Sequence, residues 1–367
     1  KKVDVAASYI LNDQDNVMVS KSRSENLLPE NRVVSLREGN EKNFKNEHKF
    51  NLDFEVKIDS TSTLAFVPKF EMGNNKSYVR STNDFFSIDN QLISSSNLER
   101  FSEEDRKTFE NIIIYNKKFK NKNGFTFRFD NENTNSKSFT TNKGNSIFNQ
   151  GTNPDDIRDQ HWLSDSRKDK YNLGFEYSIF IDNKQTLRLN AQYGNEEQTN
   201  NKNTLDFNET ASAYSDINQL QSYRNTFNKE EIKAGLGYEI THKKGNLRLG
   251  LGSKWNQYEM FSLYNNENYL NKKTEVLPEL SLSNSWKFGK STRLYVSYRY
   301  QGTVPSMSQL TEYQDLSSTI SVTQGNKNLK PKLTNSLNLS FNNYDFTSRS
   351  GYYIYFGGSL DSRGIMS

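Results

Sequence analysis

Apolar and polar residues alternate in short segments that recur along the whole chain. From Lys49 to Ile58, Phe, Leu, Val and Ile occupy every second position, and Lys, Asn, Asp and Glu lie between them. A period of two is typical of a β-strand with one apolar face and one polar face. A second alternating segment, from Leu64 to Met72, follows the short polar turn at 59–62. Together the two segments predict a β-hairpin.

The same hairpin pattern starts again near residues 111, 171, 232, 278 and 333, and a lone strand over 3–9 precedes the first hairpin. The pattern therefore predicts thirteen strands. Each has about 9–11 residues, which is the length that a tilted strand needs to cross a bilayer.

Short turns join the two strands of each hairpin, whereas the connections between hairpins are long. Segments 73–110 and 130–169 are examples, and both are rich in Asn, Ser, Thr, Lys and Asp. This alternation is typical of barrels in the outer membrane of Gram-negative cells. We therefore predict an all-β fold, a transmembrane antiparallel up-and-down β-barrel with short periplasmic turns and long extracellular loops.

The composition fits a barrel better than a disordered chain. Hydrophobic residues make up 33% of the 367 residues and the mean hydropathy is −0.91, but aromatic residues reach 13%. One face of a barrel strand meets lipid and the other meets water or a plug, so half of its residues can be polar. Lys49, Asp53, Glu55 and Lys57 are then expected to face inward, and Phe54 and Leu249 to face lipid. A soluble β-sandwich is the alternative, and it predicts shorter loops.

Charge and cysteine content exclude other classes. The net charge of +4 gives no basic stripe for nucleic acid. The absence of cysteine excludes disulfides, Cys-based zinc sites and thiol nucleophiles. The sequence contains no apolar run of about 18 residues, so it predicts no transmembrane helix. Because no signal-peptide core follows Lys1, the chain is expected to be a piece of a longer protein.

Candidate chemistry is sparse. The three histidines, His48, His161 and His242, lie in separate segments, whereas zinc needs clustered ligands. The sequence contains no nucleophile elbow, P-loop or H-E-x-x-H motif. We therefore expect no catalytic residue, no metal and no cofactor, and no enzymatic activity.

Two groups of residues have open interpretations. Asn153, Asp155, Asp156 and Asp159 either hold calcium in an extracellular loop or are solvated. A second group falls in the predicted loop between strands ending near 255 and starting near 278. Its aromatic side chains either bind a sugar or protein partner or pack one loop against another; they are Tyr258, Phe261, Tyr264 and Tyr269.

Three segments near the C-terminal end carry a family resemblance. They are P-S-M-S-Q-L at 305–310, D-L-S at 315–317 and G-N-K-N-L-K-P at 325–331. This pattern resembles a signature of outer-membrane barrels from Bacteroidota that are similar to TonB-dependent receptors. Earlier segments agree, so the resemblance covers almost the whole chain. Lys327, Lys332 and the run 178–180 depart from the family pattern, which bears on the subfamily.

The resemblance implies a larger protein with a signal peptide, a small regulatory-like domain, a plug and a barrel of about 22 strands. Residues 1–367 would be a partial barrel domain, with the remaining strands elsewhere. The implied function is import of a ligand that binds to the extracellular loops and the plug. Implied partners are outer-membrane lipid, the TonB energy-coupling system and surface lipoproteins, with no nucleic acid. The alternative is a non-transporting barrel that serves as a structural subunit, adhesin or interaction platform. Neither reading assigns ligand-binding residues.

Overall fold

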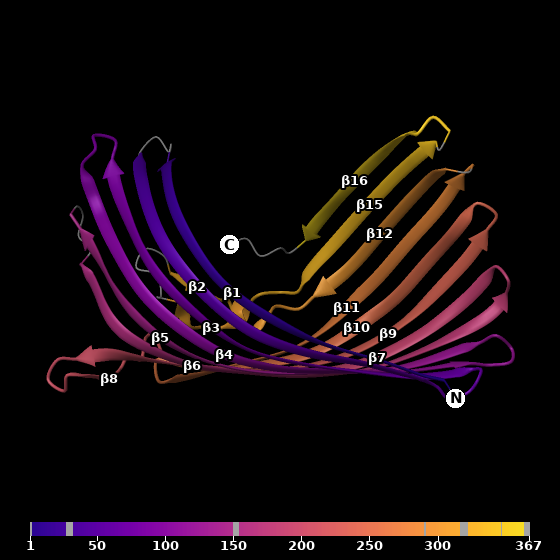
Figure 1. Cartoon of the computed structure of the whole chain (residues 1–367), viewed down its shortest axis with the longest axis horizontal. Coiled ribbons are helices and arrows are strands. Elements are labelled where there is room, and N and C mark those ends of the chain that lie inside the picture. The colour runs from indigo at the N-terminus through magenta and orange to yellow at the C-terminus, as the bar shows by residue number, and fades with distance from the viewer. Residues whose placement is uncertain are drawn as a thin grey trace.

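The computed structural model describes residues 2–26, 32–149, 154–289, 291–315, 322–345 and 347–362. It is dominated by one antiparallel sheet of 14 strands that curves into an open trough (Figure 1). Nearly every strand pairs with its neighbours in the chain, in the order β1-β2-β3-β4-β5-β6-β7-β9-β10-β11-β12-β15-β16, and β8 pairs with β7. The fold class predicted from the sequence, an all-β up-and-down antiparallel sheet, is therefore confirmed.

The sheet strands are β1 (Lys2–Asn26), β2 (Val33–Lys57), β3 (Ser62–Ser87), β4 (Leu92–Lys118), β5 (Gly124–Phe148), β6 (Asp156–Asp182), β7 (Gln185–Asn208), β8 (Ala213–Ile217), β9 (Tyr223–His242), β10 (Gly245–Tyr264), β11 (Glu267–Phe288), β12 (Thr292–Thr303), β15 (Lys332–Asp345) and β16 (Ser350–Ser362). A short helix, α1 (Met307–Leu310), and a two-stranded ribbon of β13 (Gln314–Asp315) and β14 (Thr323–Gln324) lie between β12 and β15.

Strand length is the main departure from the prediction. The strands from β1 to β11, apart from β8, have 20 to 27 residues instead of about 9–11. Segments 73–110 and 130–169, expected as loops, are mostly continuations of strands; the β3–β4 ladder runs from Ser62–Lys117 to Phe86–Leu92. The loop prediction was wrong because alternation of apolar and polar residues ends where the strand leaves lipid, whereas backbone pairing continues.

The short turns were placed correctly. β2 and β3 are separated by four residues, and β6 and β7 by only two, Asn183 and Lys184. At the β11–β12 turn Gly289 has a φ of 84°, which glycine adopts without steric cost. These turns lie at the same end of the sheet, on the right of Figure 1.

The two faces of the sheet differ in polarity as expected. Two residues that are paired across antiparallel strands lie on the same face of the sheet. Once the faces of one strand are known, the strand register therefore assigns the residues of every other strand to a face. Tyr258 and Met260 of β10 pack under α1 and therefore lie on the concave face. The alternation of side chains along β10 places Arg248, Gly250 and Lys254 on the same face and Leu249 on the convex face. Following the pairs to β2 places Asp53 and Glu55 on the concave face and Phe54 on the convex face.

The apolar convex residues form a band next to the short turns, which we call the lipid band. Most strands contribute about four convex positions to it, for example Phe109 to Tyr115 on β4, where only Asn111 is polar, and Leu187 to Tyr193 on β7. Beyond the band the convex residues become polar, as at Asn131 and Glu230. Aromatic residues mark its upper edge, in keeping with an interfacial girdle; they are Phe109, Tyr171, Tyr193, Trp255 and Tyr300.

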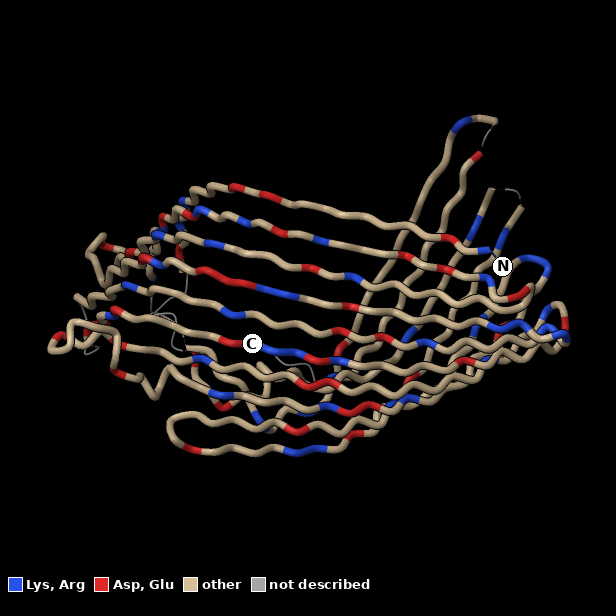
Figure 2. The backbone as a smooth tube through the Cα atoms, turned by 60° about the horizontal axis from the view of Figure 1, so that its bottom comes forward, with Lys and Arg blue, Asp and Glu red and all other residues tan. Residues whose placement is uncertain are grey.

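Ion pairs cover the concave face at the level of the lipid band. Glu239 forms ion pairs with Arg188 at 2.7 Å and with Arg248 at 3.1 Å, and Glu279 forms one with Lys254 at 2.9 Å. Figure 2 shows acidic and basic residues interspersed over the sheet as a whole. A concave wall of paired charges is suited to water or a polar plug rather than lipid. The helix in the described residues, α1, is too short to cross a membrane.

Candidate functional site

The described residues between β12 and β15, 304–315 and 322–331, fold back into the trough, and we call them the strap (Figure 1). Its helix α1 has only four residues, so packing must stabilise it. Met307 and Leu310 are buried against Phe227, Tyr258 and Met260, with 1% of Leu310 exposed. The strap therefore forms a small hydrophobic core on the concave face of the sheet.

The first and last family-like segments, at 305–310 and 325–331, meet inside the strap, whereas residues 316 and 317 of the middle segment lie outside the described residues. Ser306 and Gln309 form a capping box at the start of α1. Gly325 crosses α1 so closely that a Cβ atom would lie 2.5 Å from the Thr311 carbonyl oxygen. The next residue, Asn326, donates its backbone N–H to the Gln309 carbonyl at 2.7 Å. The segment at 325–331 therefore packs directly against the segment at 305–310.

Polar contacts fasten the strap to β9, β10 and β11. Asn225 donates from its side-chain amide to the Thr311 hydroxyl at 3.1 Å, and the Ser262 hydroxyl donates to Asn225 at 2.6 Å. The Lys273 ammonium donates to the Leu329 carbonyl at 3.1 Å. Both apolar and polar groups therefore hold the strap on the wall.

A basic and aromatic group lies beside the strap, on the concave face beyond the lipid band. We call Arg100, Arg158, Trp162, Lys202, Tyr313 and Asp315 the inner cluster. The Lys202 ammonium is 4.2 Å and the Arg100 guanidinium 4.8 Å from the Trp162 ring centroid. Lys202 also lies 3.5 Å from the hydroxyl of Tyr313, which the strap supplies. The arrangement can bind anionic or aromatic groups through charge and cation–π contacts.

Burial controls the charge of the inner cluster. Lys202 is 8% exposed, and its removal from water lowers its pKa to about 8, with Asp315 opposing the shift and Arg100 adding to it. Burial also raises the pKa of Tyr313. The strap therefore covers a lysine that titrates much closer to neutral pH than a solvated lysine does.

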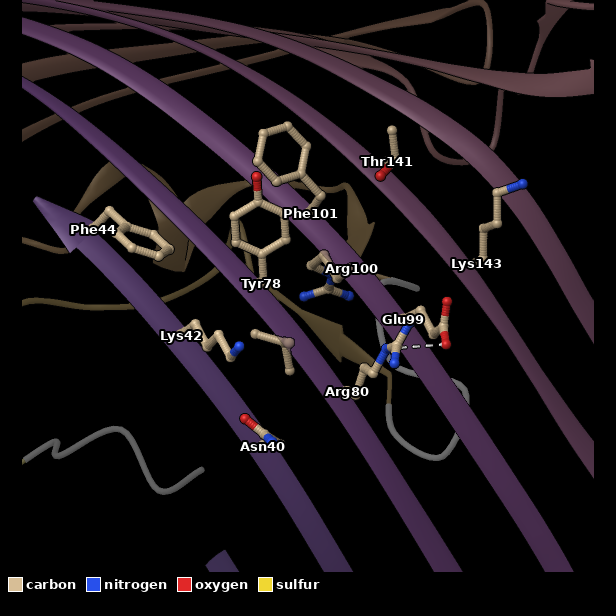
Figure 3. A pocket seen from close by; sticks show the side chains of 11 residues that line it. Asn40, Lys42, Phe44, Tyr78, Arg80, Glu99, Arg100, Phe101, Thr141 and Lys143 are labelled. Carbon is tan, nitrogen blue, oxygen red and sulfur yellow. Dashed lines mark ion pairs between the residues drawn. The ribbon is translucent and has the colours of Figure 1, made fainter. Parts of the chain in front are cut away.

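A second hollow lies on the convex face of β2–β5, beyond the lipid band (Figure 3). We call it the outer groove; its volume is about 620 Å³. The rings of Phe44 and Tyr78 are 6.2 Å apart, and those of Tyr78 and Phe101 are 4.7 Å apart. Apart from Val79, its other lining residues are polar or charged; they are Asn40, Lys42, Arg80, Glu99, Arg100, Thr141 and Lys143.

Sequence reasoning missed both the inner cluster and the outer groove because it placed them in loops. One signal was available for the groove. Phe101 is eight residues from Phe109, and Tyr78 is eight residues from Phe70, so each pair shares a strand face if the strand continues. No comparable signal exists for Trp162 and Lys202, which only the register of β6 and β7 brings together.

The structure does not bring the three histidines together. His48 on β2 contacts the Tyr9 hydroxyl at 2.6 Å, and His161 on β6 stacks on Tyr214 with ring centroids 3.4 Å apart. His242 accepts from the Lys244 backbone N–H at the β9–β10 turn. In the part of the chain that the structure describes, no three His, Asp or Glu side chains converge as metal ligands would.

The aspartates proposed for calcium point to different partners. Asp155 accepts from the Phe148 backbone N–H at 3.0 Å, Asp156 pairs with Arg158, and Asp159 pairs with Lys143 at 3.0 Å. Asn153 lies outside the described residues. Asp156 and Asp159 also differ in strand parity, so the strand turns them to opposite faces. The arrangement does not build a calcium site from these carboxylates.

The four aromatic residues expected in a loop lie on strands β10 and β11 instead. Asn265 and Asn266, with φ of 52° and 60°, make the two-residue turn that the sequence reading overlooked. Tyr258 is buried under the strap, Tyr264 packs 5.4 Å from Tyr313, and Tyr269 donates to Glu267. Phe261 lies on the opposite face of β10. Tyr258 and Tyr264 therefore pack against the strap.

Comparisons with solved structures find outer-membrane barrels at low sequence identity. The alcaligin outer membrane receptor FauA from Bordetella pertussis shares 10% identity and a TM-score of 0.42, over 98% of this chain and 52% of FauA. The translocator domain of the autotransporter NalP from Neisseria meningitidis shares 11% identity and a TM-score of 0.26, over 82% of each chain. This chain thus spans about half the length of FauA.

No curated protein sequence matches the chain. A family model does: residues 117–362 match the outer membrane protein beta-barrel family. That match covers well over half of the chain, and it agrees with the lipid band, the girdle and the polar concave wall. The chain belongs to the outer membrane protein β-barrel family and is integral to the outer membrane.

Proposed function

We propose that the chain is the barrel portion of a transporter that resembles TonB-dependent receptors and imports a ligand from outside the cell. The strap, folded over a polar wall beside the inner cluster, is the observation that carries this proposal. It lies at the end of the sheet opposite the short turns, which is the extracellular end of an outer-membrane barrel. A ligand entering from outside would meet the strap and the inner cluster first.

The wall below the strap suits passage of a polar ligand. Its paired charges, such as Arg188 with Glu239 and Lys254 with Glu279, are already compensated and need no counter-ion from the ligand. Lipid contacts on the convex face would anchor this part of the barrel in the membrane, while a plug fills the lumen. In this proposal β1 and β16 pair with further strands, because open sheet edges do not occur in lipid.

The partners follow from the same proposal. Outer-membrane lipid surrounds the band, the TonB system acts through a plug, and surface lipoproteins meet the extracellular end. We assign no enzymatic activity and no cofactor to this barrel. The ligand-binding role falls to the inner cluster, with Lys202 and Arg100 as the charged groups and Trp162 and Tyr313 as the aromatic ones.

The second candidate is a non-transporting barrel that serves as a structural subunit, adhesin or interaction platform. The length of the strands favours it, since they continue far beyond the lipid band and present a large polar surface outside the membrane. This platform would not require a plug or energy coupling.

The two candidates differ in what precedes the barrel. Intact mass and N-terminal peptide sequencing of the mature full-length protein would find a plug-sized domain of roughly 100–200 upstream residues if the barrel transports. That protein should also bind the immobilised periplasmic domain of the energy-coupling protein, and removal of the upstream segment should abolish binding. A mature protein without such a domain and without binding would exclude the transporter and leave the platform.

A further inference from the structure

The outer groove lies on the side of the sheet that faces the membrane lipids, but beyond their hydrocarbon layer. Phe101 precedes Phe109 by eight residues on β4 and lies further from the short turns, and Phe109 marks the edge of the lipid band. At about 3.3 Å per residue this places the groove roughly 26 Å along the strand from that edge, and less in height because barrel strands tilt. The lumen is on the other face, so a transported ligand does not reach the groove.

Aromatic side chains are exposed in the groove although no lipid tails reach them. Tyr78 is 47% and Phe44 39% exposed, and both belong to the continuous row that ends at Phe101. An exposed apolar row in a polar surrounding marks a binding surface. The flat faces of such rings stack well against the C–H faces of sugar rings.

Positive charge surrounds the aromatic row. Lys42, Arg80 and Lys143 line the groove together with a single acidic side chain, Glu99. Arg80 lies 3.2 Å from Glu99, and Lys143 lies 3.0 Å from Asp159 at the rim. Lys42 has no ion pair within the described residues and is exposed. The lining therefore attracts an anionic group while Asn40 and Thr141 offer hydrogen bonds to hydroxyls.

The groove continues away from the membrane. A second hollow of about 470 Å³ on the same face shares Asn40, Arg80 and Glu99 with it and extends to Lys21 and Glu38 on β1 and β2. A chain of several rings fits this course better than a compact ligand does.

We propose that the outer groove binds the anionic saccharide headgroup of glycolipids in the outer leaflet of the outer membrane. At this height and on this face, the headgroups of neighbouring lipids are the molecules that the groove meets. The aromatic row would hold a sugar ring, and Lys42 and Arg80 would hold phosphate or carboxylate groups. Direct protein docking is the competing occupant that the experiment must exclude.

The test uses the full-length protein in detergent and native mass spectrometry. Three lipids serve as probes: lipopolysaccharide with a complete core, lipopolysaccharide lacking the core sugars, and phosphatidylglycerol. The variant Lys42→Ala/Tyr78→Ala is compared with Lys45→Ala/Asn75→Ala, which changes the same two strands on the concave face. Heat-dependent gel migration verifies that both variants are folded barrels.

The expected result is that the groove variant binds complete-core lipopolysaccharide about tenfold more weakly than wild type, whereas the concave-face variant binds it unchanged. Binding of the two lipids without core sugars should be the same in all three proteins. Unchanged binding of the complete-core lipid by the groove variant would overturn the proposal and favour a protein occupant. An equal loss for phosphatidylglycerol would also overturn it, because it would show attraction to charge without recognition of sugar.

Discussion

The two halves of strand β4 differ in their surroundings but not in their backbone. Near the β4–β5 turn, convex residues such as Ile113 and Tyr115 are apolar, whereas beyond Phe109 they include Lys107 and Glu103. The same ladder to β5 runs through both halves, from Lys118–Gly124 to Ser94–Phe148. Strand pairing thus sets how far the sheet extends, and the convex side chains set which part of it lies in lipid.

The largest effect is expected when a charge is placed on the convex face within the lipid band, because this tests directly which part of the sheet lies in lipid. Leu249→Arg should destabilise the folded barrel by about 2–4 kcal/mol if the residue lies at the bilayer midplane, because the guanidinium would be buried in hydrocarbon. Reversible urea unfolding in lipid vesicles measures this loss.

Two matched variants sharpen that result. Thr199→Arg places the same residue on the convex face beyond the band, and Asp53→Arg places it on the concave face. Both should change the free energy of unfolding only slightly. Equal losses at all three positions would show that the band does not lie in lipid.

The strap gives the next largest expected effect, and it concerns the half outside lipid. Leu310→Ala should weaken strap docking by about 2 kcal/mol because it leaves a cavity against Tyr258 and Met260. The change should speed proteolytic cleavage within the strap and leave urea unfolding of the lipid band nearly unchanged. Cleavage of Leu310→Ala at the wild-type rate would contradict the packing of α1 described here.

The buried Lys202 predicts a pH dependence of the same docking. Its pKa is lowered to about 8, so between about pH 8 and the normal lysine pKa the docked state carries fewer protons than the released state. Docking should therefore strengthen as the pH rises through this range, by at most about 1.4 kcal/mol per pH unit, and be weakest below pH 8. Strap proteolysis at several pH values measures this trend. In Lys202→Met the trend should disappear, and a persistent trend would assign it to another group.

The smallest effect is expected for an exposed ion pair at the far end of the sheet. Lys21 and Glu38 are 2.7 Å apart, but their side chains are 71% and 62% exposed. Lys21→Ala should therefore change stability by less than about 0.5 kcal/mol. Thermal unfolding of the folded barrel in detergent gives this value, and a larger loss would mean that the extension depends on its surface charges.

The sequence predicted the part of the fold that lipid imposes. Alternation identified the hairpins, their short turns, and the opposite faces of Asp53 and Phe54, because only lipid on one side requires that pattern. Outside lipid neither face must be apolar, so the continuation of β3 to β6 left only isolated aromatic residues in phase with the lipid band, such as Phe101 with Phe109. The inner cluster was beyond prediction, because Arg100, Trp162 and Lys202 meet only through the register of four strands.

The position of the membrane is tested most directly along β5, where Phe127, Asn133 and Phe139 all face the convex side. The chain has no native cysteine, so each position can carry the only cysteine and a fluorescent label. In lipid vesicles, quenchers attached to lipid tails should quench the label strongly at position 127, weakly at 133 and not at 139, where a water-soluble quencher should act instead. Strong quenching by lipid tails at position 139 would contradict a lipid band confined to the half of the sheet beside the short turns.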